Sequence, residues 1–240
     1  LRVRHHYDRG RLVELTDADT GASYWRLDAL DARGHVSSES LGNGVRVVSQ
    51  YDPVSGLLTE RTAGIGGGST HQNLAFEWDA AGNLVRRAER NAGVEEGFAY
   101  DALDRLDTVQ RAGVLSLDLA YDAVGNLTYK SDVGEYRYDP VRRDKLVAAG
   151  SNTFEHDANG AIVNASGTRI HWSSFDLPSR IQHPAGNYSV FEYGPDRART
   201  RQLALAAGTA TETIYAANGL YERVRTGDRM SHRHYIVEDG

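Results

Sequence analysis

The chain has 240 residues, a net charge of −6 and a pI of about 5.8, so no overall positive field draws it to nucleic acid or acidic membranes. It contains no cysteine, which excludes disulfides, thiolate catalysis and cysteine-ligated metals. No apolar run approaches the roughly 18 residues that a membrane-spanning helix needs, and 25 glycines suit a chain with many tight turns.

A short frame recurs from the start of the chain onward. It consists of an aromatic residue, an aspartate, two or three variable residues, glycine or a polar residue, and an aliphatic residue. Clear copies are "YDRGRL" at 7–12, "WDAAGNL" at 78–84 and "YDAVGNL" at 121–127, while "YDALDRL" at 100–106 has aspartate in place of glycine. The positions that open the copies are Tyr7, Leu30, Tyr51, Trp78, Tyr100, Tyr121, Tyr138, His156, Phe175, Tyr193 and Tyr215.

These eleven positions are 17 to 27 residues apart and fill the chain from end to end. Self-similarity at such a spacing is the signature of a repeat architecture. We therefore predict one repeat domain over residues 1–240, with about eleven repeats, as a fragment of a longer chain. The predicted structural anchors are Tyr7, Asp8, Tyr51, Asp52, Trp78, Asp79, Gly82, Tyr100, Asp101, Tyr121, Asp122, Gly125, Tyr138, Asp139, His156, Asp157, Phe175, Asp176, Tyr193 and Tyr215.

Each repeat has the pattern of a β-hairpin. Leu127 and Tyr129 share one face of a strand, "DVG" at 132–134 signals a turn, and Tyr136 and Tyr138 share one face of the next strand. In the Tyr-Asp-x-x-Gly-Asn segment, the aspartate can accept a backbone hydrogen bond from two residues on, and glycine or asparagine tolerates positive φ. The repeat therefore predicts two short strands and two tight turns.

The predicted fold class is all-β, a long antiparallel β-meander of hairpins with roughly 22 strands. An aromatic ring at the same place in each repeat would let neighbouring rings stack into a ladder. At ~4.8 Å per strand the ribbon would be on the order of 100 Å wide. Open sheets rarely exceed ~10 strands without curling or splitting, so we expect the ribbon to form part of a hollow shell or spiral.

Two segments fit this scheme less clearly. For residues 200–213, one or two helical turns are the alternative to a strand. The sequence "GIGGGST" at 64–70 predicts a flexible loop tip, since it lacks both the lysine and the strand–loop–helix context of a phosphate-binding loop.

Candidate metal sites are few. His232 and His234 have the spacing of one strand face, but no third ligand lies near them in sequence, so a solvated strand face is favoured. "DADTG" at 17–21 resembles the start of a calcium loop without its later glutamate, so a turn is favoured there. With no nucleophile-elbow or zinc-protease motif either, we expect no catalytic residue, no metal and no cofactor.

The frame seen in "YDAVGNL", "WDAAGNL" and "YDPVSGLL" resembles the RHS or YD-repeat family. This family includes bacterial rearrangement-hotspot proteins, the B and C components of insecticidal toxin complexes, and teneurins. "GPDRARTRQ" at 194–202 and "RHYIVEDG" at 233–240 are also similar to segments found late in such shells. The resemblance implies a long β-sheet that spirals into a hollow shell and, in bacterial members, holds a variable C-terminal toxin until delivery.

The function that this resemblance implies is structural, with no enzyme activity. The chain would be a shell segment of a secreted or extracellular bacterial toxin, and its partners would be the C-terminal toxin domain and the remaining shell segments. The alternative is a binding module that recognises carbohydrate or a cell-surface partner through the outer face of the sheet, with cell-surface carbohydrate as a possible ligand. No autoproteolytic site is carried over, because the family's Asp-Pro-x-Gly-Leu signature has no match at 52–57 or 139–140.

Overall fold

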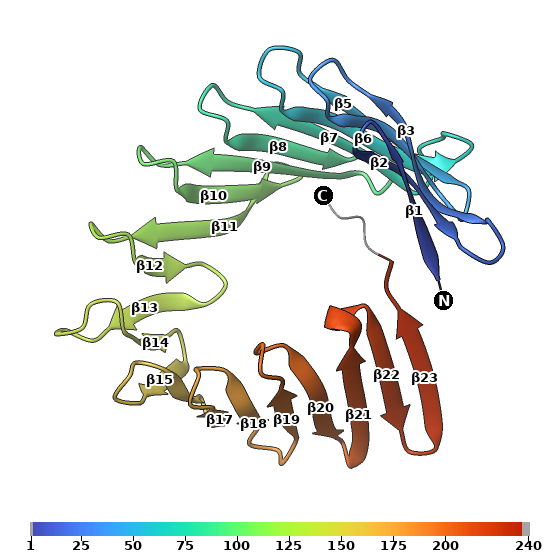
Figure 1. Ribbon diagram of the computed structural model, residues 1–240. Helices are drawn as coiled ribbons and strands as arrows, with labels where there is room; N and C mark the ends of the chain where they lie inside the picture. Colours follow the sequence, from blue (N-terminus) through green and yellow to red (C-terminus); the bar gives the residue numbers. More distant parts are fainter. Residues whose placement is uncertain (1, 237–240) are drawn as a thin grey trace. The chain divides into compact units, whose positions relative to one another are not determined.

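A computed structural model describes residues 2–236, so the end of the segment 233–240 lies outside the described residues. The described chain has 23 β-strands and no α-helix, and its one short 3-10 turn is η1 (Ala217–Gly219) (Figure 1). None of its described segments is a helix of the length and apolarity needed to cross a membrane. The strands are β1 (Val3–Asp8), β2 (Arg11–Asp17), β3 (Ser23–Leu30), β4 (Val36–Leu41), β5 (Val45–Tyr51), β6 (Leu58–Ile65), β7 (Gln72–Trp78), β8 (Leu84–Glu89), β9 (Val94–Tyr100), β10 (Leu106–Arg111), β11 (Val114–Tyr121), β12 (Leu127–Lys130), β13 (Gly134–Tyr138), β14 (Leu146–Ala149), β15 (Asn152–His156), β16 (Ile162–Ala165), β17 (Thr168–Trp172), β18 (Pro178–Gln182), β19 (Tyr188–Tyr193), β20 (Arg199–Ala206), β21 (Thr209–Ala216), β22 (Tyr221–Thr226) and β23 (Arg229–His234).

The strands form an antiparallel meander within a 23-stranded sheet, which confirms the predicted fold class. From β1 to β11, and again from β13 to β23, every strand pairs with the next one along the chain. Residues 200–213 lie mainly in β20 and β21, so the strand reading of that segment is confirmed. Of the predicted loop tip at 64–70, Gly64 and Ile65 end β6 and the other residues follow that strand.

A break in register recurs at the aromatic residue of several frames. Gln50 pairs with Glu60 but Tyr51 pairs with Leu58, so Thr59 has no partner on β5. The same one-residue shift occurs at Trp78, Tyr138, His156, Trp172 and Tyr193. Such a bulge bends the strand and increases its local twist, so the aromatic residue of the frame marks a bend in the ribbon.

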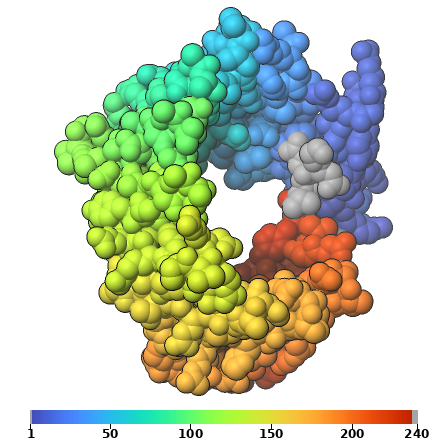
Figure 2. Space-filling model, turned by 90° about the vertical axis from the view of Figure 1, so that its left-hand side faces the viewer, coloured from blue at the N-terminus to red at the C-terminus, as the bar shows by residue number. Residues whose placement is uncertain are grey.

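Backbone contacts divide the chain into two units. The first contains the residues up to Tyr121 together with Lys130–Asp132, and the second contains Asp122–Tyr129 and the residues from Val133 onward. In Figure 2 neighbouring colours from green to red lie side by side over the second unit, as expected for strands that lie beside their neighbours in sequence. The assignment of a single repeat domain stays a prediction.

Burial is greatest in the first unit. Leu15 on β2 is 1% exposed, and Trp25 beside it donates its ring N–H to Glu39 Oε2 at 2.8 Å. Glu39 also pairs with Arg61 at 3.2 Å. In the described part of the second unit the buried apolar residues are Ala148 and Ala149. That unit is therefore held more by strand pairing and turn contacts than by a thick core.

Candidate functional site

The aspartate of the frame organises its own turn. Asp101 Oδ1 accepts hydrogen bonds from the backbone N–H groups of Leu103 (2.8 Å) and Arg105 (3.1 Å), and the N–H of Asp101 donates to the carbonyl of Arg105 (2.9 Å). A buried or half-buried backbone N–H needs such a partner, and here the aspartate supplies it inside the turn. Asp31, Asp79, Asp122 and Asp157 make the same bonds two and four residues on.

The turns at Asp52 and Asp139 are longer. The N–H of Asp52 donates to Leu57, and that of Asp139 donates to Lys145. Both carboxylates instead accept N–H groups two and three residues on. The frame therefore tolerates one or two inserted residues without losing the carboxylate that closes it.

These bonds favour the ionised carboxylate. Backbone N–H donors lower the pKa of Asp52, Asp79 and Asp139 below the ordinary value, with Ser55, Asn83 and Arg142 as the leading donors. The pKa of Asp101 is lowered first by the Arg105 guanidinium, which lies 2.7 Å from its carboxylate. The turns are thus stabilised by ionised aspartates.

We expect this contribution to disappear in acid. A group whose pKa is lower in the folded state contributes fully above its unfolded pKa, about 3.9 for aspartate, and its contribution is lost as the pH falls through the folded pKa. The difference in unfolding free energy between the native chain and Asp79→Asn should be constant from pH 7 to 5 and shrink below about pH 4. Urea denaturation at each pH measures it. A difference that does not change down to pH 2.5 would contradict the role of the carboxylate charge.

The fifth residue of the frame has positive φ. Gly125 has φ of +97° and Gly82 has φ of +90°, with no atom near the space a Cβ would occupy. Asp104, at φ of 58°, takes the same place in the frame at 100–106. The constraint is therefore the backbone conformation and not lack of room.

Gly125→Val should consequently destabilise the second unit by about 1–3 kcal/mol, because β-branched residues strongly disfavour positive φ. Ala123→Ser, in the exposed part of the same turn, should change stability by less than about 0.5 kcal/mol. Thermal denaturation ranks the two variants, and the reverse order would refute the turn assignment.

The aromatic ring of the frame connects one repeat to the one before it. In seven repeats the ring O–H or N–H donates to a backbone carbonyl 10 to 20 residues earlier, and the acceptor is always the first residue of the strand that follows the preceding turn. Each such bond contributes about 1 kcal/mol net. The bonds run from Tyr51 to Val36 (3.2 Å), Trp78 to Leu58 (2.7 Å), Tyr100 to Leu84 (2.9 Å), Tyr121 to Leu106 (2.8 Å), Tyr138 to Leu127 (2.9 Å), Trp172 to Ile162 (2.9 Å) and Tyr193 to Pro178 (2.8 Å).

We call these seven bonds the ring–carbonyl ladder. It differs from the stack of rings that the sequence suggested, because the connection between repeats is a hydrogen bond from ring to backbone. Ring contacts do occur, but with other side chains, as between Phe175 and Tyr193 (5.9 Å). A hydrogen-bonded ring fixes both the position and the orientation of the strand it touches, which a stack of rings alone would not.

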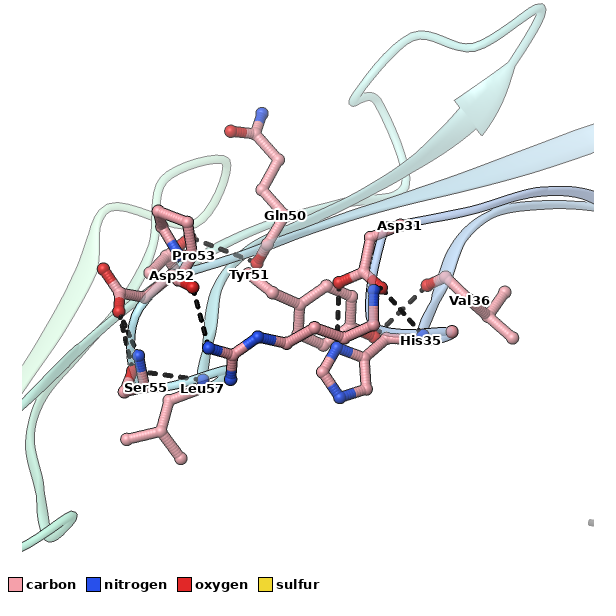
Figure 3. Close-up of polar contacts among 12 residues, drawn as sticks. Asp31, His35, Val36, Gln50, Tyr51, Asp52, Pro53, Ser55 and Leu57 are labelled. Atoms are coloured by element: carbon pink, nitrogen blue, oxygen red, sulfur yellow. Dashed lines mark hydrogen bonds and ion pairs between the residues drawn. The ribbon is translucent and has the colours of Figure 1, made fainter.

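Successive turns are also linked to one another. Arg33, in the turn after β3, donates to the carbonyls of Pro53 (2.8 Å) and Val54 (2.7 Å) in the turn after β5. Figure 3 shows this region, where the ring of His35 lies against that of Tyr51 (4.6 Å) and His35 Nδ1 lies 2.8 Å from Asp31 Oδ2. Asn83 and Asn126 make similar links to the turn that follows each of them. The sequence reading missed this row of linked turns.

The anchors predicted at Phe175 and Asp176 need correction. At Phe175 and Asp176 the frame is placed three residues too late: Trp172 donates to the ladder, Ser173 takes the aspartate position, and Asp176 (φ 61°) takes the glycine position. The serine hydroxyl accepts the N–H of Leu177 at 3.2 Å, so it replaces the carboxylate. Because serine stands here where other frames have aspartate, the sequence pattern did not reveal that this repeat begins at Trp172.

The frame at Tyr7 and Asp8 is also different. Arg9 (φ 49°) and Gly10 (φ 84°) form a two-residue hairpin turn between β1 and β2, and Tyr7 is 61% exposed. Tyr215 does not reach a backbone carbonyl of the ladder type, since its O–H donates to the side chain of Gln202 at 3.1 Å. Both residues lie at frame positions without performing the anchor role.

The remaining candidate ligands are accounted for by local contacts. Asp17 Oδ1 accepts the N–H groups of Asp19 and Thr20, and its Oδ2 accepts the O–H of Tyr24, so this segment is a turn. His232 and His234 do share a face, with Tyr221 between them; the Tyr221 O–H and His232 Nδ1 are 2.7 Å apart. Among residues 2–236 no group of three or more His, Cys, Asp or Glu side chains is arranged to hold a metal.

Charged side chains on the strands are paired across the sheet. Arg86 bonds Glu77 (2.5 Å) and Glu95 (2.8 Å) on the strands to either side, and in the second unit Arg201 bonds Glu192 and Glu212, each at 2.7 Å. The equal nine-residue spacing of Glu77, Arg86 and Glu95 is a signal that could have predicted the first trio. These strand positions are therefore polar, with each arginine paired to a glutamate on both sides.

Comparisons with known proteins agree with this geometry. No protein-family model matches the sequence. Double-stranded DNA deaminase toxin A of Burkholderia cenocepacia is 26% identical over 230 residues, which cover 88% of this chain and 15% of that protein. The crystal structure of TcdB2-TccC3 superposes with a TM-score of 0.69 at 17% identity, covering 95% of this chain and 14% of the other. The Tc holotoxin pore of Photorhabdus luminescens, a TccC3 variant, gives 0.63 at 16% identity, with 95% and 14% coverage.

The structural matches show that the chain has the fold of a section of the Tc toxin proteins. The chain spans at most 15% of the length of each of the three proteins.

Proposed function

We propose that residues 1–240 are a wall segment of the shell of a secreted bacterial toxin of the RHS or YD-repeat family, and that this shell encloses a C-terminal toxin domain before delivery. The observation that carries the proposal is the ring–carbonyl ladder. Seven repeats join to their predecessors by the same bond, so the ribbon can be lengthened by adding repeats. A wall needs this property, whereas an enzyme or a receptor site does not.

The relatives support the toxin context. One is named as a toxin and two solved structures belong to Tc toxin assemblies, all much longer than this chain. The catalytic activity in the name of the deaminase relative is not proposed for this segment, which we expect to have no turnover of its own. Its proposed partners are the remaining shell segments and the enclosed toxin domain.

The strand faces suit a wall around a loosely held chain. A strongly apolar lining would make such a cargo collapse onto it, and a strongly basic lining would retain an acidic cargo. Here the arginines on the strands are paired with glutamates, and the Arg86 and Arg201 trios each hold two glutamates for one arginine, so these positions are neither apolar nor basic. Such paired, polar positions favour containment over tight binding of a cargo.

Limited proteolysis of the intact parent protein tests the proposal. The C-terminal segment should be resistant in the parent and should be cut rapidly when residues 1–240 are deleted. Equal cutting rates in the two proteins would reject enclosure and leave recognition of a cell-surface partner as the better interpretation.

A further inference from the structure

One position of the ring–carbonyl ladder is occupied by a titratable ring. His156 ends β15 at the register break where the other repeats carry tyrosine or tryptophan, and it pairs with Ile162 as Trp78 pairs with Leu84. By the rule of the ladder its acceptor would be the carbonyl of Leu146, the first residue of β14. The Nδ1 atom of His156 is nevertheless buried without a hydrogen-bond partner.

The surroundings of this ring are cationic. The pKa of His156 is lowered by burial, then by Lys145 and Arg142 in the preceding turn, while Asp157 acts in the opposite direction. The two strands packed beside it contribute no ionisable side chain, since β14 reads Leu-Val-Ala-Ala and β16 reads Ile-Val-Asn-Ala. The ring therefore sits between apolar strands and two positive charges.

The strand pairing is also sparse here. Two residue pairs join β14 to β15 and three join β15 to β16, whereas seven join β5 to β6 and six join β20 to β21. Regions with few backbone bonds and few buried contacts open most readily. The titratable ring thus lies in a part of the ribbon with little strand pairing to oppose an added charge.

We propose that His156 makes this repeat a pH-sensitive weak point of the ribbon. Protonation of its imidazole places a positive charge in the half-buried ring position beside Lys145 and Arg142, and loosens the pairing of β14, β15 and β16. The regulatory meaning rests on the proposed function, since in a shell this is where acidification would open the wall.

The lowered pKa of His156 determines how the stability of this repeat depends on pH. The folded state favours the neutral imidazole, so the repeat has its full stability above the unfolded pKa of about 6.5. It loses stability as the pH falls below that value. Each pKa unit between the folded and unfolded states corresponds to about a tenfold change in the opening equilibrium. The response of this position therefore begins as the pH falls below about 6.5.

Hydrogen exchange read by mass spectrometry at pH 7.5 and 5.5, corrected for intrinsic rates, tests the proposal on the chain itself. Between the two pH values, protection of residues 146–165 should fall several-fold more in the native chain than in His156→Phe, which keeps a ring but cannot titrate. His156→Tyr should also abolish the pH response and raise protection at both pH values, because a phenol can reach the Leu146 carbonyl.

Two controls make the result specific. Residues 199–226 should show no such response, and His171→Phe, at an exposed position of β17 in the same unit, should behave like the native chain. An equal pH response in the native chain and His156→Phe would overturn the proposal. No cargo is involved in this measurement, so its failure leaves enclosure untouched, and failure of the proteolysis test leaves the histidine switch untouched.

Discussion

Replacing Trp78 by alanine should lower the free energy of unfolding of the first unit by about 3 kcal/mol, near the lower end for removal of a packed tryptophan because the ring is only half-buried. The substitution removes the contact with Phe76 (ring centroids 6.5 Å apart) and the bond to the Leu58 carbonyl at 2.7 Å. It therefore breaks the ladder between two repeats. Urea denaturation followed by circular dichroism measures the change.

Trp78→Phe separates the two contributions. It retains an aromatic ring against Phe76 but leaves the Leu58 carbonyl without its donor, so it should cost about 1 kcal/mol. If alanine and phenylalanine cost the same small amount, the tryptophan would be a surface residue and the ladder would not support the fold.

Gly150→Ala should destabilise the second unit by about 3 kcal/mol, the upper end of the usual cost of overpacking. Gly150 (φ +56°) opens the two-residue turn between β14 and β15, and a Cβ there would lie well inside contact distance of the backbone carbonyl oxygen of Val133. Backbone cannot move aside as a flexible side chain can, so the turn itself must shift. Thermal denaturation and hydrogen exchange of β14 and β15 report the loss.

The chain contains its own control for this prediction. Ala112 and Ala207 occupy the same place in two other two-residue turns, with φ of 50° and 49°, so the backbone conformation alone does not forbid alanine. Ala207→Gly should accordingly be close to neutral. A Gly150→Ala variant as stable as Ala207→Gly would show that the close approach to Val133 does not exist.

The turns were predictable because their requirements are local. An aspartate that bonds N–H groups two and four residues on, and a residue with positive φ before the turn ends, leave a mark within five residues of sequence, as at Asp122 and Gly125. Ser173 and Asp176 meet the same requirements with different residues, and this is why the frame at Phe175 was placed three residues too late.

The ladder acceptors could not be predicted in the same way. Which carbonyl a ring reaches depends on strand register and on a one-residue bulge, and both are set by pairing across the sheet, 15 residues away for Tyr121 and Leu106. The Nδ1 atom of His156, which lacks a hydrogen bond, likewise stands out only against the seven hydrogen-bonded rings. The sequence thus predicted the repeat and its turns, while the connections between repeats required the structure.

The most direct test of a protective wall is protease protection of the C-terminal segment in an intact parent protein that carries Gly150→Ala. Compared with the native parent and with Ala207→Gly, this variant should release the segment to protease faster, because β14 and β15 no longer pair stably within the ribbon. Hydrogen exchange on the same sample verifies that these strands have opened. A segment that stays equally protected while β14 and β15 are open would contradict the account, since its protection would not depend on this wall.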